Sequence, residues 1–149
     1  MKDFYKFSLI GVFLLTFYQS NCQVVGILVD NEPVFTVDTD VLIANYNANM
    51  QELSGLEVTF TSVEIVQVDT IYYLVFYNDG ITTRSSLGIK LSGNDNNLLN
   101  VQGGTSCTTT DCSSSNTGCV PRLLFKGCTP CENEGKCTRT SSNYSLIEL

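Results

Sequence analysis

The sequence contains no histidine, and this absence removes several kinds of chemistry. Without an imidazole there is no general base for the Ser-His and Cys-His pairs of covalent hydrolases. Metal sites that mix histidine with cysteine are excluded for the same reason. Carboxylate pairs remain at Asp38/Asp40 and Glu57/Glu64, but helix capping and solvated strand faces account for them more simply. We therefore expect a protein that is not an enzyme, with no catalytic residues, no cofactor and no metal.

Charged residues are also scarce, at 15% of the chain against roughly 25% in an average soluble protein. The polar surface must therefore come mainly from Asn, Ser, Thr and Gln, some of which favour strands and turns over helices. The formal net charge is −7, and the few basic residues form no cluster. An acidic chain without a basic patch is poorly suited to bind nucleic acid or an anionic membrane surface.

The first residues have the pattern of a secretory signal peptide. Lys2 and Lys6 give a basic start, and the stretch from Phe7 to Tyr18 carries no charge. This stretch is shorter than the about 20 apolar residues that span a bilayer. We therefore expect residues 1–22 to direct export and to be removed from the mature protein.

Two kinds of processing fit the end of this signal. Cys22 stands where a bacterial lipoprotein carries its acylated cysteine, with Gln19 in place of the usual Leu and Asn21 in place of Gly or Ala. Alternatively, Ser20 and Cys22 are the small residues of an ordinary cleavage site. In both cases Cys22 is not available for internal bridges, so six of the seven cysteines remain to pair with one another. A lipid on Cys22 would be the only route to a membrane.

Residues 23–103 contain no cysteine after the signal and show frequent apolar alternation. Strands are predicted at 24–29, 34–37, 56–61, 71–77, 81–91 and 98–101, with a turn at 30–33 and the hairpin turn Asn78-Asp79-Gly80. The strand at 71–77 is apolar on both faces, as expected of a central strand with both faces covered. In the strand at 81–91, Ser85, Leu87 and Ile89 share one face, and Arg84 and Ser86 lie on the other.

One amphipathic helix is predicted from Val41 to about Leu53, with Asp38, Thr39 or Asp40 as its cap and Ser54-Gly55 as its end. Its apolar face consists of Leu42, Tyr46, Met50 and Leu53. The fold class is therefore α+β, with one helix packed on a curved antiparallel sheet. This architecture is similar to cystatin-like folds, and the analogy concerns the fold alone.

Residues 104–149 are rich in Ser and Thr and poor in large apolar side chains, so we expect a small, irregular, disulfide-rich tail. Its six cysteines are spaced as Cys107-x4-Cys112-x6-Cys119-x8-Cys128-x2-Cys131-x5-Cys137. In an exported protein an even number of cysteines indicates three disulfides, and six cysteines allow 15 pairings. All six are therefore disulfide candidates.

The run from Cys128 to Cys137 matches other cysteine motifs only in part. Cys128-Thr129-Pro130-Cys131 resembles the CxxC of thioredoxin-like oxidoreductases, but the βαβ context of that family is missing here. A cysteine-only metal site needs reduced thiolates, which export disfavours. Pro130 to Cys137 is similar to the PC-x-N-x-G-x-C opening of epidermal-growth-factor-like modules, without the further cysteines that such modules need. In that turn, Asn133 and Gly135 are expected to take left-handed conformations.

The whole chain resembles small exported bacterial proteins, often lipid-anchored, that pair an α+β body with a cysteine-rich C-terminal tail. The resemblance is carried by the signal with Cys22, the strand Tyr72 to Val75, and the CTPC run with the following Gly135-Lys136-Cys137. It implies a secreted or envelope-anchored protein and transfers no activity. We expect a non-enzymatic binding or envelope-structural protein with a protein or glycan partner. The alternatives are a secreted inhibitor or effector that acts through a disulfide-held loop at 121–126, and an oxidoreductase that uses Cys128 and Cys131.

Overall fold

The computed structural model describes residues 23–55, 57–92, 95–100, 104–115, 117–122 and 127–141. The expected signal peptide, including Cys22, lies outside the described residues. In chain order the elements are β1 (Gln23–Val29), β2 (Glu32–Phe35), α1 (Thr39–Ser54), β3 (Phe60–Val68), β4 (Ile71–Asn78), the short 3-10 turn η1 (Asp79–Ile81), β5 (Arg84–Leu91), β6 (Asn97–Asn100), β7 (Thr105–Thr109) and β8 (Thr138–Ser141).

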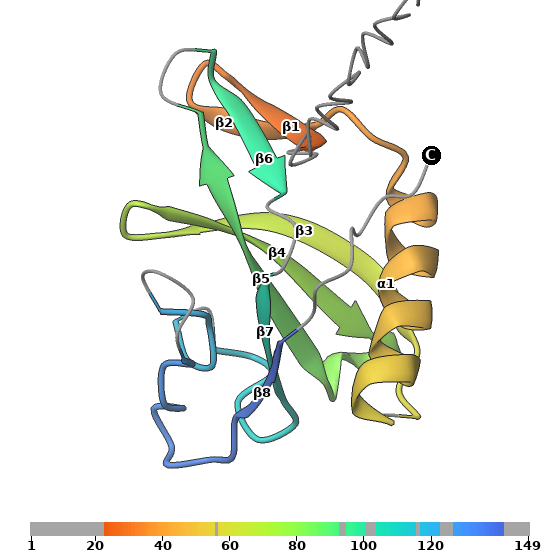
Figure 1. The fold of residues 1–149 in the computed structure, drawn as a ribbon. Helices are drawn as coiled ribbons and strands as arrows, with labels where there is room; N and C mark the ends of the chain where they lie inside the picture. The colour runs from red at the N-terminus through yellow and green to blue at the C-terminus, as the bar shows by residue number, and fades with distance from the viewer. Residues whose placement is uncertain are drawn as a thin grey trace, which may run out of the picture.

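The predicted α+β class is confirmed, because a helix packs on an antiparallel sheet. The strand order is β2-β1-β6-β5-β4-β3, and β7 pairs with β5 on one side and β8 on the other. β5 pairs with two different strands along one of its edges. Its first residues pair with β7, and its last two, Lys90 and Leu91, pair with β6. Figure 1 shows β1, β2 and β6 at one end of the molecule and the cysteine-rich segment at the other.

The first hairpin turns more tightly than predicted. The turn consists of Asp30 and Asn31 alone, both with positive φ (52° and 68°), and Glu32 already pairs with Val29. Asp and Asn tolerate this left-handed conformation, and two such residues give the turn that matches the twist of paired strands. Pro33 therefore lies in β2, where it is tolerated because β2 is the edge strand of the sheet order.

The strand predicted at 56–61 is wrong in its bounds. β3 begins at Phe60, and a register shift against β4 lies between Phe60 and Ser62. This irregularity lies at the start of the strand, which then continues to Val68. Residues 57–59 precede the strand.

The helix extends slightly beyond its predicted ends. Asp38 is the N-cap, and its Oδ1 accepts hydrogen bonds from the backbone N–H groups of Asp40 (2.9 Å) and Val41 (3.4 Å). Gly55 ends the helix with φ 62°, and its N–H donates to the carbonyl of Gln51. Asp38 therefore serves as a helix cap, which is the role expected for it from the sequence.

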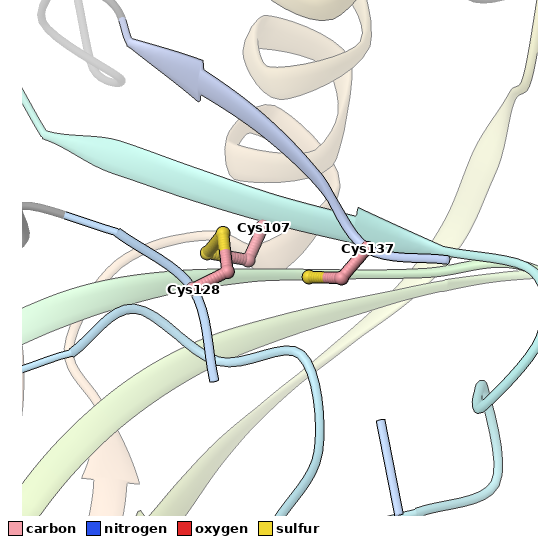
Figure 2. A group of neighbouring side chains, drawn as sticks. All are labelled: Cys107, Cys128 and Cys137. Carbon is pink, nitrogen blue, oxygen red and sulfur yellow. A yellow bond between two sulfur atoms is a disulfide. The ribbon is translucent and has the colours of Figure 1, made fainter. Parts of the chain in front are cut away.

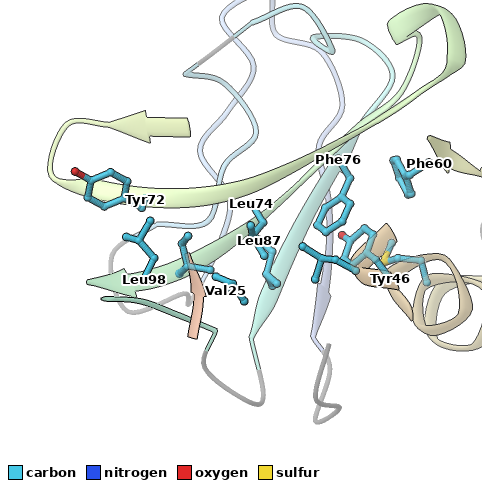
Figure 3. Packing of buried hydrophobic residues seen from close by; sticks show 11 residues of the cluster. Val25, Tyr46, Phe60, Tyr72, Leu74, Phe76, Leu87 and Leu98 are labelled. Atoms are coloured by element: carbon cyan, nitrogen blue, oxygen red, sulfur yellow. The ribbon is translucent and has the colours of Figure 1, made fainter. Parts of the chain in front are cut away.

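The main core lies between α1 and the sheet (Figure 3). Leu42, Tyr46 and Met50 are buried there, as predicted for the apolar helix face. The ring of Tyr46 stacks on Phe76, with centroids 3.8 Å apart and an interplanar angle of 7°. Leu74, Leu87, Ile89 and Leu98 complete this layer from β4, β5 and β6. Burying these side chains supplies most of the driving force for folding the body.

Part of the surface under α1 is polar. The hydroxyl of Tyr46 lies 2.6 Å from Ser85 Oγ, which lies 2.6 Å from Thr108 Oγ1, so one buried hydrogen-bonded chain joins α1, β5 and β7. Ser106 of β7 also donates to the Met50 sulfur at 3.7 Å. Desolvation by burial raises the pKa of Tyr46 to about 12, against the lowering effect of its hydroxyl partners. The helix thus contacts a strand of the cysteine-rich segment as well as the body.

We predict that Gly26→Ala destabilises the fold. A Cβ at position 26 would lie 2.7 Å from the carbonyl oxygen of Val34 and 2.9 Å from Cδ1 of Ile65, because β1 packs closely against both. The expected loss is about 1–3 kcal/mol in the free energy of unfolding. Gly127→Ala is the matched control, since a Cβ there meets nothing within 4 Å. Urea unfolding that shows equal stabilities for the two variants would contradict this packing.

We also predict that Tyr46 makes the protein sensitive to alkaline pH. The unfolded chain ionises this phenol near pH 10, whereas the folded protein keeps the proton to about pH 12. Stability that is present below pH 10 is therefore lost as the pH rises toward 12, by roughly 2–3 kcal/mol. Tyr46→Phe keeps the ring but removes the ionisation, so its unfolding free energy should fall less over this range. Parallel pH profiles for the two proteins would disprove the assignment.

Candidate functional site

The second face of the sheet, opposite α1, is covered by the cysteine-rich segment. Tyr73 and Val75 of β4 are buried on this face together with Val120. The Tyr73 hydroxyl donates to the carbonyl of Pro121 at 2.9 Å, and Arg84 Nη2 donates to the carbonyl of Gly118. The prediction that 71–77 is covered on both faces is therefore confirmed, and this segment is the second cover.

The segment contains two strands that the sequence prediction did not include. β7 pairs with β5 from Arg84↔Thr109 to Leu87↔Ser106, and β8 adds to the outer edge of β7. The composition break predicted at 103/104 thus falls between β6 and β7, which both pair with β5. The sheet continues across this break.

Three disulfides hold the segment together. They join Cys107 to Cys128, Cys112 to Cys131 and Cys119 to Cys137, with Cα atoms 5.8, 5.8 and 5.5 Å apart. The first three cysteines therefore bond to the last three in the same order. This supports the expected use of the cysteines as disulfides and selects one pairing among the 15 that the count allows.

The two cysteines of the CTPC run are not bonded to each other. Cys128 is joined to Cys107 on β7, and Cys131 is joined to Cys112 in the turn that follows β7. A thioredoxin-like pair would form its bond within the CxxC run. Here each cysteine of the run belongs to a different bridge, and both bridges join the run to the first part of the segment, at Cys107 and Cys112.

The chain between Cys119 and Cys128, called the arm below, has a base that is closed by described residues at its two ends. Pro121 and Cys128 form a β-bridge, Arg122 N–H donates to the Gly127 carbonyl at 2.8 Å, and Thr129 N–H donates to the Val120 carbonyl at 2.8 Å. The loop at 121–126 predicted as an inhibitory element begins in this base, and residues 123–126 lie outside the described residues. The described part of the arm is held by two disulfides, by the bond from Tyr73 and by these backbone contacts.

A second turn is organised by Asp111. Its Oδ2 accepts from the backbone N–H of Lys136 at 2.8 Å, and its carbonyl accepts from the side-chain amide of Asn133 at 2.8 Å. Gly135 is required here by close approach, since a Cβ would lie 2.4 Å from Asp111 Cβ. The left-handed residue of this turn is Glu134 (φ 59°). The prediction that Asn133 and Gly135 take the left-handed conformation is therefore wrong. Asn133 instead donates a hydrogen bond to the Asp111 carbonyl, and Gly135 leaves room for the Asp111 side chain.

Arg84 is the most unusual charged residue at this site, with only 1% of its surface exposed. Desolvation by burial lowers the pKa of its guanidinium, while the nearby Tyr77 raises it. Within the part of the chain that the structure describes, neither its Nε nor the hydroxyl of Ser86, two residues along the same face of β5, has a hydrogen-bond partner. Sequence alternation placed Arg84 and Ser86 on this face correctly, but it gave no sign that the face is covered.

Three sulfur atoms of the segment lie close enough together to suggest metal ligands. The Sγ atoms of Cys107, Cys128 and Cys137 are all within 4.8 Å of one another (Figure 2). Two of the three are bonded to each other, and Cys137 is bonded to Cys119. Disulfide sulfur is not the thiolate that zinc and related metals bind. The cluster is therefore a place where two disulfides meet.

The fold and the site together define a small α+β protein with a disulfide-fastened cover. No family model matches the chain, and neither a curated protein nor a solved structure resembles it significantly. Among the described residues there is no helix of the length and apolar character needed to cross a membrane.

We predict that the turn around Asp111 weakens in acid. The backbone N–H of Lys136 and the hydroxyl of Thr110 hold the pKa of this exposed carboxyl below its ordinary value of 3.8. Because the pKa of this carboxyl is lower in the folded than in the unfolded protein, the ionised carboxylate stabilises the fold at pH values above the unfolded pKa. This contribution is lost as the pH falls through the folded pKa. The difference in unfolding free energy between the wild type and Asp111→Asn should therefore shrink from pH 6 to pH 2. A difference that stays constant over this range would show that the carboxylate charge has no part in holding the turn.

Proposed function

We propose that this chain is an exported, non-enzymatic binding or envelope-structural protein whose cysteine-rich segment is a rigid contact surface. The observation that carries the proposal is the set of three disulfides between residues 107 and 137. Disulfides at this density are typical of proteins that function in an oxidising compartment outside the cytosol. The signal-like residues 1–22 support the same conclusion from the sequence.

Several polar side chains of the segment are used to build its structure, which favours a binding surface over a reactive one. Thr117 donates to Glu132, Asn133 donates to the Asp111 carbonyl, and Thr109 Oγ1 donates to the Lys136 carbonyl at 2.8 Å. The described part of the segment exposes Asp111, Glu132 and Glu134 together with Arg122, Lys136 and Arg139, so acidic and basic side chains are balanced on it. A protein or glycan partner suits such a polar surface of mixed charge.

A secreted inhibitor or effector is the second candidate, and the closed base of the arm favours it. An inhibitory loop binds tightly when its ends are fixed before binding, because less conformational entropy is then lost on association. The bridge between Pro121 and Cys128 and the bond from Tyr73 provide such a fixed base. The two candidates differ in whether the protein stays at the cell envelope or leaves it.

Mass spectrometry of the mature protein from the envelope and from the medium tests this proposal. We expect a chain that starts at or directly after Cys22 and gains on reduction the mass expected for three disulfides. Acyl mass on Cys22, lost together with envelope retention in Cys22→Ala, identifies the anchored protein, whereas an unmodified chain in the medium identifies the secreted inhibitor or effector. A chain that keeps residues 1–22, or that has most of its six downstream cysteines free, would overturn the proposal of export.

A further inference from the structure

Two of the disulfides meet closely enough to exchange partners. Figure 2 shows the bonded sulfurs of Cys107 and Cys128 with the sulfur of Cys137 beside them, and all three lie within 4.8 Å of one another. Cys137 is bonded to Cys119, so the cluster joins the Cys107–Cys128 and Cys119–Cys137 bridges. The third bridge, Cys112–Cys131, contributes no sulfur to the cluster.

The strand register gives an independent reason for this proximity. Cys107 on β7 pairs with Arg139 on β8, and Cys137 lies two residues before Arg139, directly ahead of β8. Residues two apart along an extended chain point to the same side, and diagonal neighbours on adjacent strands are within reach of each other. The backbone therefore brings Cys107 and Cys137 together independently of their disulfide partners.

We propose that Cys137, once released from Cys119, exchanges into the neighbouring bridge and forms a Cys107–Cys137 disulfide. The required reductant is an external dithiol. Its first thiolate attacks Sγ of Cys137, a partly exposed residue, and the bonding electron pair leaves on buried Cys119, which takes up a proton. Its second thiol then closes the reductant's own disulfide and releases the Cys137 thiolate. The protein has gained two electrons at this point.

The exchange that follows involves no further electrons. The Cys137 thiolate attacks Cys107 Sγ, the Cys107–Cys128 bond breaks, and the electron pair leaves on Cys128. Cys128 is the better leaving group, because it is partly exposed and its thiolate can be solvated, whereas Cys107 is fully buried. The products are one Cys107–Cys137 disulfide and two thiols, at Cys119 and Cys128.

The consequence is a redox-controlled loss of two covalent attachments, those at Cys119 and Cys128. Without exchange, reduction of one bridge would leave the other in place. With exchange, a single two-electron reduction removes both bridges, while Cys107 on β7 becomes joined to Cys137, directly ahead of β8. The bond from Tyr73 and the backbone contacts between Val120 and Thr129 are then left to hold this part of the chain. Cys112–Cys131 continues to hold the chain just beyond the arm.

The variant Cys119→Ser tests the exchange without any reductant. It leaves one thiol, initially on Cys137, which can redistribute at pH 8 before acid quenching and alkylation. Trypsin then cleaves after Lys90, Arg122, Lys126, Lys136 and Arg139, so Cys137 lies on peptide 137–139 and Cys128 on peptide 127–136. We expect most of the label on Cys128, and peptide 137–139 linked to peptide 91–122, which Cys112–Cys131 still joins to peptide 127–136. In the control Cys112→Ser, the label should stay on Cys131.

Label that remains on Cys137 in Cys119→Ser would overturn the proposal, as would equal redistribution in the control. If Cys119→Ser does not fold, the wild-type protein serves instead, after partial reduction by a phosphine and rapid alkylation. Doubly alkylated molecules that carry label on Cys119 should carry the second label on Cys128. A second label on Cys137, or the absence of any molecule labelled on both Cys119 and Cys128, would refute the exchange.

Discussion

The structure depends on the cover that β4 needs on both of its faces. β4 presents Leu74 and Phe76 to α1 and Tyr73 and Val75 to the opposite side, and all four side chains are buried. A strand that is apolar on both faces is stable in water only between two layers. The helix provides one layer from within the body. The other layer must come from a segment with few large apolar side chains of its own.

The disulfides compensate for that shortage. A segment built from Thr, Ser, Gly and Asn gains little from apolar burial, so its ordered state must be favoured by restricting its unfolded chain, by about 2–4 kcal/mol for each bridge. The bridges alone do not place it on the sheet. The pairing of β7 with β5 and the bonds from Tyr73 and Arg84 do so. Covalent links set the segment's shape, and sheet pairing sets its position.

The elements with a strong local signal were predictable from the sequence. The helix and its ends followed from Asp38, Gly55 and the spacing of Leu42, Tyr46 and Met50, and the central strand followed from its continuous apolar run. The use of the cysteines as disulfides followed from the six, an even number, that remain when Cys22 is assigned to the expected signal. These signals can be read locally, because capping and periodicity depend on neighbouring residues and the cysteine count depends on composition alone.

The remaining features depend on contacts between residues far apart in the chain. Thr105–Thr109 lacks the apolar alternation that predicts a strand, and its small polar residues are buried by pairing with β5 and β8 and by contact with α1. Arg84 has the sequence pattern of an exposed strand residue, and it is buried where the cysteine-rich segment, through Gly118, covers it. The disulfide pairing and the closeness of Cys137 to a second bridge are likewise set by register. Sequence alternation gives the face of a residue but not what covers that face.

The cysteine-rich segment is thus an integral cover of the sheet, and its disulfides keep it ordered. Hydrogen exchange followed by mass spectrometry, on the oxidised protein and on the fully reduced and alkylated protein, tests this claim directly. We expect slow exchange at Thr105–Thr109 and along β5 in the oxidised protein. On reduction this protection should be lost at β7, whereas exchange at α1 and β1 should change much less. Rapid exchange at β7 in the oxidised protein, or protection there that is unchanged after reduction, would contradict it.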